Sequence, residues 1–152
     1  NIGGDILDAG AAWSVFMIIS GAGIFFMGRI ENKLKRDKLF MVCGYSIICL
    51  GFLGYYFISN VMQLFIIQII LGLGTMIVIP ARDSFYTQYL EKGNFASQWA
   101  AWESVAYITS GVGALMGAFI AKVFGFKYLF LVMFAMSFVG LILSTQLNDK
   151  ND

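Results

Sequence analysis

Five apolar stretches, each about 20 residues long, dominate the chain and are separated by shorter polar segments. They cover residues 11–28, 39–58, 61–81, 99–121 and 128–146. About 20 mostly apolar residues suffice for a helix to cross a bilayer. Lipid offers no hydrogen-bond partners to the backbone, so helices are expected. No segment shows the alternation of apolar and polar residues that is typical of a membrane β-strand. The pattern predicts an all-α fold: a polytopic transmembrane helix bundle with five spanning helices, embedded in the lipid bilayer.

Composition supports a membrane protein and excludes several other classes. The chain is 59% hydrophobic and 12% charged, against about 45–50% and about 25% in soluble domains. It contains no His, and its two cysteines stand six residues apart inside an apolar run, which fits neither a metal site nor a disulfide framework. No nucleophile, acid pair or ligand set is visible at membrane depth. We expect no enzyme activity, no cofactor, no metal and no nucleic-acid partner.

The charged residues are distributed unevenly. The stretch GRIENKLKRDK, residues 28–38, holds seven of the chain's nineteen charges. With alternating spans, eight Lys and Arg residues fall on one side and two, Lys122 and Lys127, on the other. Basic residues concentrate on the cytoplasmic side. The charge pattern predicts a multi-pass protein of the cell membrane with Asn1 outside and Asp152 in the cytoplasm.

The order of residues in the charged stretch is also informative. Gly, aliphatic, amide and basic positions follow one another at Gly28, Arg29, Ile30, Asn32, Lys33 and Arg36. This order resembles the signature loop of the major facilitator superfamily, Gly-x-Leu-x-Asp-Arg-x-Gly-Arg-Arg. Two positions depart from it: Asn32 replaces the aspartate, and Lys35 replaces the second glycine, so that the turn there is costlier.

The resemblance extends over the whole chain as five of the six helices of one transporter half. The Leu71-Gly72-Leu73-Gly74 run, Pro80-Ala81, the glycines of the fourth stretch and the segment 125–130 follow in the family's order. The resemblance implies a C-terminal half that lacks its first helix. Its partners would be the missing N-terminal half and a small-molecule substrate, moved by alternating access. An N-terminal half is the alternative within the family.

Glycines suggest where helices pack closely. Gly113 and Gly117 stand four residues apart on one helix face, and Gly72 and Gly74 lie in the third stretch. Small residues let membrane helices approach one another. The favoured interpretation is that these glycines only allow close helix packing. The functional interpretation is that they give the helices smooth faces, which can rock against one another during transport.

Three charges suggest a gate on the inner side. Arg82 and Asp83 close the third stretch, and Glu103 lies about four residues into the fourth, roughly 6 Å deep. We expect Glu103 to pair with Arg82, with Arg29 or Lys33 as second choices, since a charge near lipid prefers a partner. The resemblance implies that such inner pairs hold the cytoplasmic gate. Alternatively, Glu103 simply reaches the interface.

Polar residues at mid-depth are candidates for a substrate cavity, because the resemblance implies that the first, third and fourth stretches line it. They are Ser20, Gln68, Thr75, Tyr107 and Ser110. Gln68 and Tyr107 are favoured, whereas Ser and Thr hydroxyls more often bond between helices. No charged residue lies at mid-membrane, so any coupling carboxylate is expected in the missing part.

A protein of another functional class is an alternative. The chain could be a five-helix membrane scaffold or channel subunit without transport activity of its own. That reading predicts a natural start at Asn1 and a defined homo-oligomer in detergent. An intramembrane enzyme is a further alternative, but the residues it needs are not visible.

Overall fold

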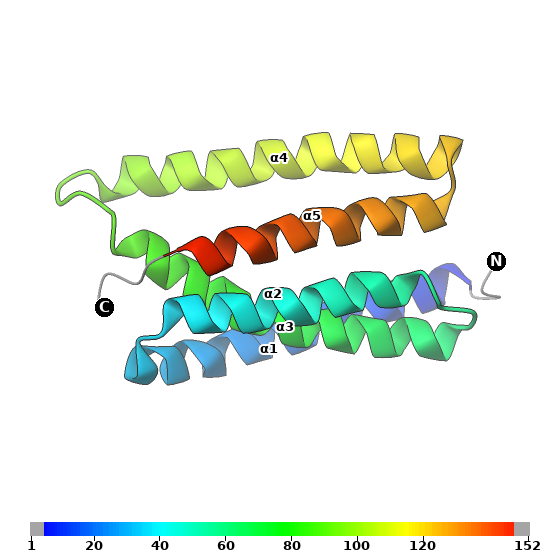
Figure 1. Ribbon diagram of the computed structural model, residues 1–152, viewed down its shortest axis with the longest axis horizontal. Helices are drawn as coiled ribbons and strands as arrows, with labels where there is room; N and C mark the ends of the chain where they lie inside the picture. The colour runs from blue at the N-terminus through cyan, green and yellow to red at the C-terminus, as the bar shows by residue number, and fades with distance from the viewer. Residues whose placement is uncertain (1–4, 148–152) are drawn as a thin grey trace.

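A computed structural model describes residues 5–147, and within that range the chain forms helices joined by short connections (Figure 1). The helices are α1 (Ile6–Leu34), α2 (Asp37–Tyr55), α3 (Val61–Thr87), α4 (Phe95–Val123) and α5 (Phe126–Gln146). All five of these helices are long and apolar enough to cross a membrane. The predicted all-α, polytopic bundle with five spanning helices is confirmed for the described part of the chain.

The helices are packed unequally. α3 lies between α1 and α2, α5 packs on α2, and α4 is outermost and packs along α5 (Figure 1). α4 has no buried residue, in contrast to α3, which has the most. The core of the described chain is therefore the α1–α2–α3 group, and α4 leaves most of its surface uncovered.

α1 extends beyond the apolar stretch at both ends. Asp5 caps its start: the Asp5 carboxylate accepts the Leu7 N–H at 2.6 Å, and Asp8 accepts the Asp5 N–H at 3.0 Å. At the other end the helix continues through the charged residues 29–34. The expected loop over 29–38 is therefore corrected to a two-residue turn. Arg, Glu and Lys are good helix formers, so the helix need not end where its apolar stretch ends.

α3 also runs past its apolar stretch. It begins at the cap residue Asn60, whose side chain accepts the Gln63 N–H at 2.9 Å, and it continues to Thr87. Pro80 lies inside the helix and does not end it. The expected polar connection over 82–98 is accordingly shorter, and about a turn and a half of α3 beyond residue 81 carries polar side chains.

Glycines let α3 approach both of its neighbours. A Cβ added at Gly72 would lie 3.0 Å from Ile19 of α1, and one at Gly74 would lie 2.7 Å from Ile48 and 3.0 Å from the carbonyl oxygen of Gly44 in α2. Side chains of any size at these positions would push the helices apart. The two glycines of α3 therefore set its distance from α1 and α2.

Candidate functional site

A cavity opens beside the middle of α3. Gln68 and Thr75 stand seven residues apart, which is about two helical turns and places them on one face. Both line a cavity of about 380 Å³. Gln68 is buried and Thr75 is half-buried. The rest of the lining is apolar or aromatic and comes from α1, α2, α3 and α5: Trp13, Phe16, Ile48, Phe52, Tyr55, Leu64, Leu71, Phe130 and Met133.

The other cavity candidates lie elsewhere. Ser20 is buried in α1, and its Oγ has no hydrogen-bond partner among the described residues. Tyr107 is 76% exposed on α4, and Ser110 is exposed on the same helix. Because α4 is outermost, the structure does not bring Tyr107 and Ser110 to Gln68. Of the five candidates, only Gln68 and Thr75 share this cavity.

A second cavity, of about 470 Å³, lies between α2, α4 and α5. It shares Ile48, Phe52 and Met133 with the first, so the two adjoin. Gly113 and Gly117 of α4 line it. A Cβ at Gly113 would meet nothing within 4 Å, and one at Gly117 would lie 3.4 Å from Leu129 of α5. The glycine face of α4 therefore borders open space more than it contacts a helix.

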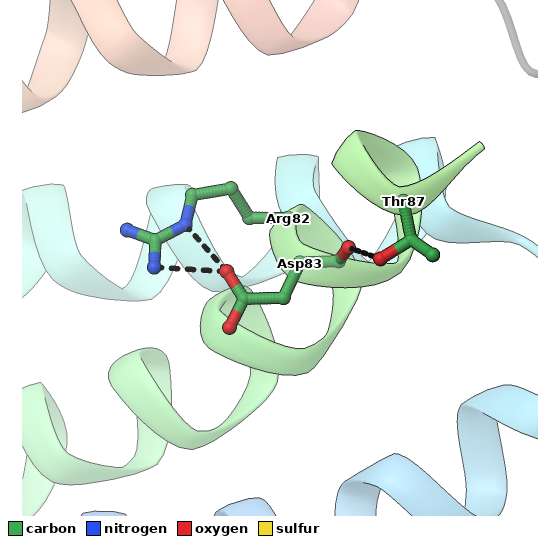
Figure 2. Close-up of polar contacts among 3 residues, drawn as sticks. All are labelled: Arg82, Asp83 and Thr87. Carbon is green, nitrogen blue, oxygen red and sulfur yellow. Dashed lines mark hydrogen bonds and ion pairs between the residues drawn. The ribbon is translucent and has the colours of Figure 1, made fainter. Parts of the chain in front are cut away.

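The charges at the end of α3 form a different pair from the expected one. Arg82 donates to Asp83 Oδ1 through Nη2 at 3.0 Å and Nε at 3.1 Å, as Figure 2 shows. The guanidinium also lies over the Trp102 ring, 5.3 Å from its centroid. Glu103 is exposed, and no Arg82–Glu103 ion pair forms within residues 5–147. One helical position is a rotation of about 100°, so Trp102 faces Arg82 and Glu103 does not.

Aromatic contacts join the end of α3 to the start of α4. The Tyr86 ring stacks on Trp102 with centroids 4.3 Å apart and meets Trp99 edge-on at 5.3 Å. The Tyr86 hydroxyl donates to the carbonyl oxygen of Gln98 at 2.8 Å. Figure 2 also shows Thr87 Oγ1 donating to the Asp83 carbonyl oxygen, at 2.7 Å. The charged end of α3 is thus the place where α4 is attached most specifically.

The signature segment is mostly solvent-facing. Its exposed residues are Arg29, Ile30, Asn32, Lys33 and Arg36. Arg29 lies over the Phe25 ring at 4.3 Å, and Gly28 is near Pro80, whose Cβ would be 4.0 Å from an added Cβ. Lys35 has φ 50° and ψ 42°, and its N–H donates to the Glu31 carbonyl oxygen at 2.8 Å. The lysine at the family's glycine position thus takes the left-handed conformation that glycine favours.

Two buried carboxylates at this end were missed by the sequence reasoning. Glu31 of α1 and Asp37 of α2 are each 3% exposed. Asp37 Oδ2 accepts hydrogen bonds from the Ser84 hydroxyl at 3.0 Å and from the Gln88 amide. A signal existed: Ser20 and Glu31 are eleven residues apart, close to three helical turns, so continuing α1 past its apolar stretch puts both on its buried face.

Glu31 and Asp37 lie outside the apolar stretches, at the polar end of the bundle. A buried ionisable group is costly unless its polar atoms have partners. Asp37 has partners on α3, whereas Glu31 Oε1 has no hydrogen-bond partner among the described residues.

Comparison with known proteins places the chain in a family. The model of the Major Facilitator Superfamily matches residues 1–150. A proton-coupled antiporter flippase, LtaA, of Staphylococcus haemolyticus is 28% identical over 119 residues, which are 72% of this chain and 29% of that protein. The quinolone resistance protein NorB of Staphylococcus aureus is 28% identical over 140 residues, 91% of this chain and 30% of that protein.

An uncharacterized MFS-type transporter of Methanocaldococcus jannaschii is 25% identical over 142 residues, 93% of this chain and 36% of its own length. The chain thus spans about a third of the length of these curated relatives. No solved structure matches it. With the family model covering nearly every residue, and with helices suited to repeated membrane crossing, the chain belongs to the Major Facilitator Superfamily of membrane transporters.

Proposed function

We propose that this chain forms five helices of the C-terminal half of a secondary transporter, and that it moves a small amphiphilic solute by alternating access. The solute would bind beside α3 and contact an N-terminal half across the cavity. The cavity with Gln68 and Thr75 carries this proposal, because it combines a volume of about 380 Å³ with two polar groups in an apolar wall.

The chemistry of the lining favours an amphiphile over a sugar or an ion. Trp13, Phe16 and Phe52 supply aromatic faces, whereas no charged side chain lines the cavity within the described residues. Sites of this kind hold apolar ligands by burial and orient them with a few polar groups. Gln68 offers one amide donor pair and one acceptor, which suits a solute with a single polar end.

The relatives are consistent with such a solute. Their names describe a proton-coupled antiporter flippase and a quinolone resistance protein. The chain covers about a third of each, which supports a site shared with a further part of the transporter. Sites between two halves are typical of inverted-repeat transporters.

The polar end would serve as the cytoplasmic gate. Its orientation rests on the excess of Lys and Arg there, because basic residues favour the cytoplasmic side. The predicted positions of Asn1 outside and Asp152 inside lie beyond the described residues and stay predictions. In the gate, Arg82 and Asp83 would be the central charges, with Glu103 joining them only in another arrangement of α4.

The test replaces Gln68 in the intact transporter reconstituted in liposomes. Transport is measured for wild type and for Gln68→Leu with three probes: a quinolone, ethidium as an aromatic cation, and glucose as a polar comparison. Leucine keeps the volume but removes the hydrogen bonds, each worth about 0.5–1.5 kcal/mol. We expect a 2- to 10-fold loss for the transported amphiphile, with no transport of glucose.

Gln146→Leu is the matched control, because Gln146 is exposed at the end of α5. This variant should transport at the wild-type rate. Unchanged transport of every probe by Gln68→Leu would remove Gln68 from the solute site. Passive leak without accumulation against a gradient would favour the channel or scaffold alternative.

A further inference from the structure

A third cavity, which the proposed solute site does not use, lies at the polar end of the bundle. It measures about 420 Å³ and is lined by the start of α2, the end of α3, the start of α4 and the end of α5. Phe85 and Tyr86 of α3 and Trp102 of α4 give it aromatic walls. Met41 of α2 and Leu143 of α5 give it an apolar side. Its volume is within the range of about 300–1,000 Å³ that is typical of sites for small molecules.

The cavity lies at the depth where the apolar stretches end. On α3 its lining residues follow residue 81, the last of the third apolar stretch, and on α4 Trp102 lies near the start of the fourth stretch at residue 99. Tyr and Trp are enriched at this boundary because their rings are apolar and carry a polar group. The cavity is therefore placed where lipid headgroups meet the hydrocarbon.

Arg82 is the one charged side chain among the described residues that line the cavity. Its Nε and Nη2 donate to Asp83, whereas no described residue accepts a hydrogen bond from Nη1, the terminal nitrogen without a dashed line in Figure 2. A guanidinium has five N–H donors and binds phosphate or carboxylate groups through pairs of them. With its side chain 40% exposed, Arg82 has donors left for an anion.

An amphiphile with one anionic end matches this arrangement. Its headgroup would accept from Arg82 at the boundary, and an acyl chain would lie against Met41 and Leu143. The charge of this end also suits an anion, because residues 29–38 and 82–103 together hold seven Lys and Arg against five Asp and Glu. Bilayer lipids are the amphiphiles that are always present at this depth, and basic pockets between spanning helices bind anionic lipid headgroups.

We propose that this cavity binds one acyl chain of an anionic phospholipid, with the lipid phosphate at Arg82. Asp83 holds the guanidinium in place and at the same time weakens the binding, because it repels the phosphate. Tyr86 and Trp102 line the cavity and also stack on each other across the junction of α3 and α4, so a bound lipid fixes α4 against α3. The site is separate from the solute cavity and can be observed without any solute.

The experiment measures lipid contact at Trp102 in the intact protein reconstituted in vesicles. Trp13 and Trp99, the other tryptophans of this chain, and any tryptophan outside it are replaced by Phe. The vesicles contain phosphatidylcholine and phosphatidylglycerol, and one of the two lipids at a time carries bromine in the upper part of its acyl chains. Bromine quenches tryptophan fluorescence on contact. The ratio of the two quenching curves therefore gives the affinity for phosphatidylglycerol relative to phosphatidylcholine at Trp102.

We expect a relative affinity of about threefold to fivefold with Arg82 present, since one basic side chain near a membrane surface contributes about that much. Arg82→Gln should lower it to about one, and Arg82→Lys should retain a preference because the charge remains. Asp83→Asn should raise it, since the repelling carboxylate is neutralised, and this variant tests the site even if Arg82→Gln does not fold. Lys92→Gln is the matched control: it removes the same charge at an exposed position in the connection between α3 and α4, and it should leave the ratio unchanged.

A second arm distinguishes a lipid phosphate from a free one. Inorganic phosphate is added to the vesicles and compared with potassium chloride at equal ionic strength, and it should relieve the quenching no more than the chloride does. Relief by phosphate that is lost in Arg82→Gln would indicate a site for a soluble anion and would overturn the lipid assignment. A ratio of one in the protein with Arg82 would also overturn it. So would equal losses in Arg82→Gln and Lys92→Gln, because they would show only a general surface attraction.

Discussion

At the residue scale, the turn between α1 and α2 is made by a lysine in a conformation that glycine adopts more easily. Lys35 has φ 50°, a region in which a side chain costs about 1–2 kcal/mol. The turn is retained because the Lys35 N–H bonds to the Glu31 carbonyl and closes α1. The strain therefore lies in the short turn between the buried carboxylates Glu31 and Asp37.

This strain makes a prediction with an unusual sign. Lys35→Gly should raise the free energy of unfolding by about 0.5 kcal/mol, since the relieved strain exceeds the extra entropy of glycine in the unfolded chain. Lys33→Gly, two residues earlier inside α1, should lower it by about 1 kcal/mol. Thermal unfolding of both purified variants in detergent compares them. An equal loss of stability in both would show that Lys35 is not strained.

At the element scale, α3 is held between α1 and α2 by glycines on two of its faces. Gly72 faces α1 and Gly74 faces α2, and the carbonyl of Gly44 lies opposite Gly74. Backbone atoms cannot move aside as a flexible side chain can. The contact with α2 is therefore more sensitive to an added methyl group than an ordinary helix contact.

Gly74→Ala should destabilise the bundle by about 1–3 kcal/mol, because overpacking a close contact forces backbone shifts. The matched control is Gly21→Ala in α1, where a Cβ would meet nothing within 4 Å, and which should be neutral or gain up to about 1 kcal/mol in helix propensity. Chemical unfolding of each variant in detergent measures the difference. Equal stabilities for the two variants would show that α2 and α3 have room to separate.

The elements themselves could be predicted from the sequence, but their ends and partners could not. Apolar length identified all five helices in the described chain, since spanning a bilayer requires such length. The charged ends were taken for loops because hydropathy says nothing about whether a helix continues into water. For the same reason Glu31 and Asp37 were overlooked, although they lie on the buried side of α1 and at the start of α2.

The candidate site was predictable in part. Gln68 and Thr75 share a cavity because they lie on the same helix, where spacing fixes the face. Whether Tyr107 and Ser110 reach the cavity depends on how α4 is placed against the other helices. The expected pairing of Glu103 with Arg82 depends on the same placement. Spacing within one helix cannot determine such a placement. Contacts between helices far apart in sequence were therefore the ones that the sequence left open.

At the scale of the whole molecule, the outermost position of α4 matters most (Figure 1). α4 is attached through α5 and through Tyr86, whose ring stacks on Trp102. Arg82 also lies over the Trp102 ring and is held by Asp83. A movement of α4 relative to α3 would therefore act directly on the Arg82–Asp83 pair, which is what a gate at this end requires.

The last prediction tests that gate in the intact transporter. The side chains of Arg82 and Asp83 are 40% and 35% exposed, and an exposed ion pair contributes about 0.2–1 kcal/mol. Arg82→Gln and Asp83→Asn should therefore each change the transport rate by up to about fivefold, without loss of membrane insertion. The double variant should be no slower than the slower single one, because either change already breaks the pair. Transport by Glu91→Gln should equal wild type. Additive losses in the double variant would mean that the two charges act on different partners. The transport rate of Glu103→Gln would then show whether Arg82 turns to Glu103 as the gate moves.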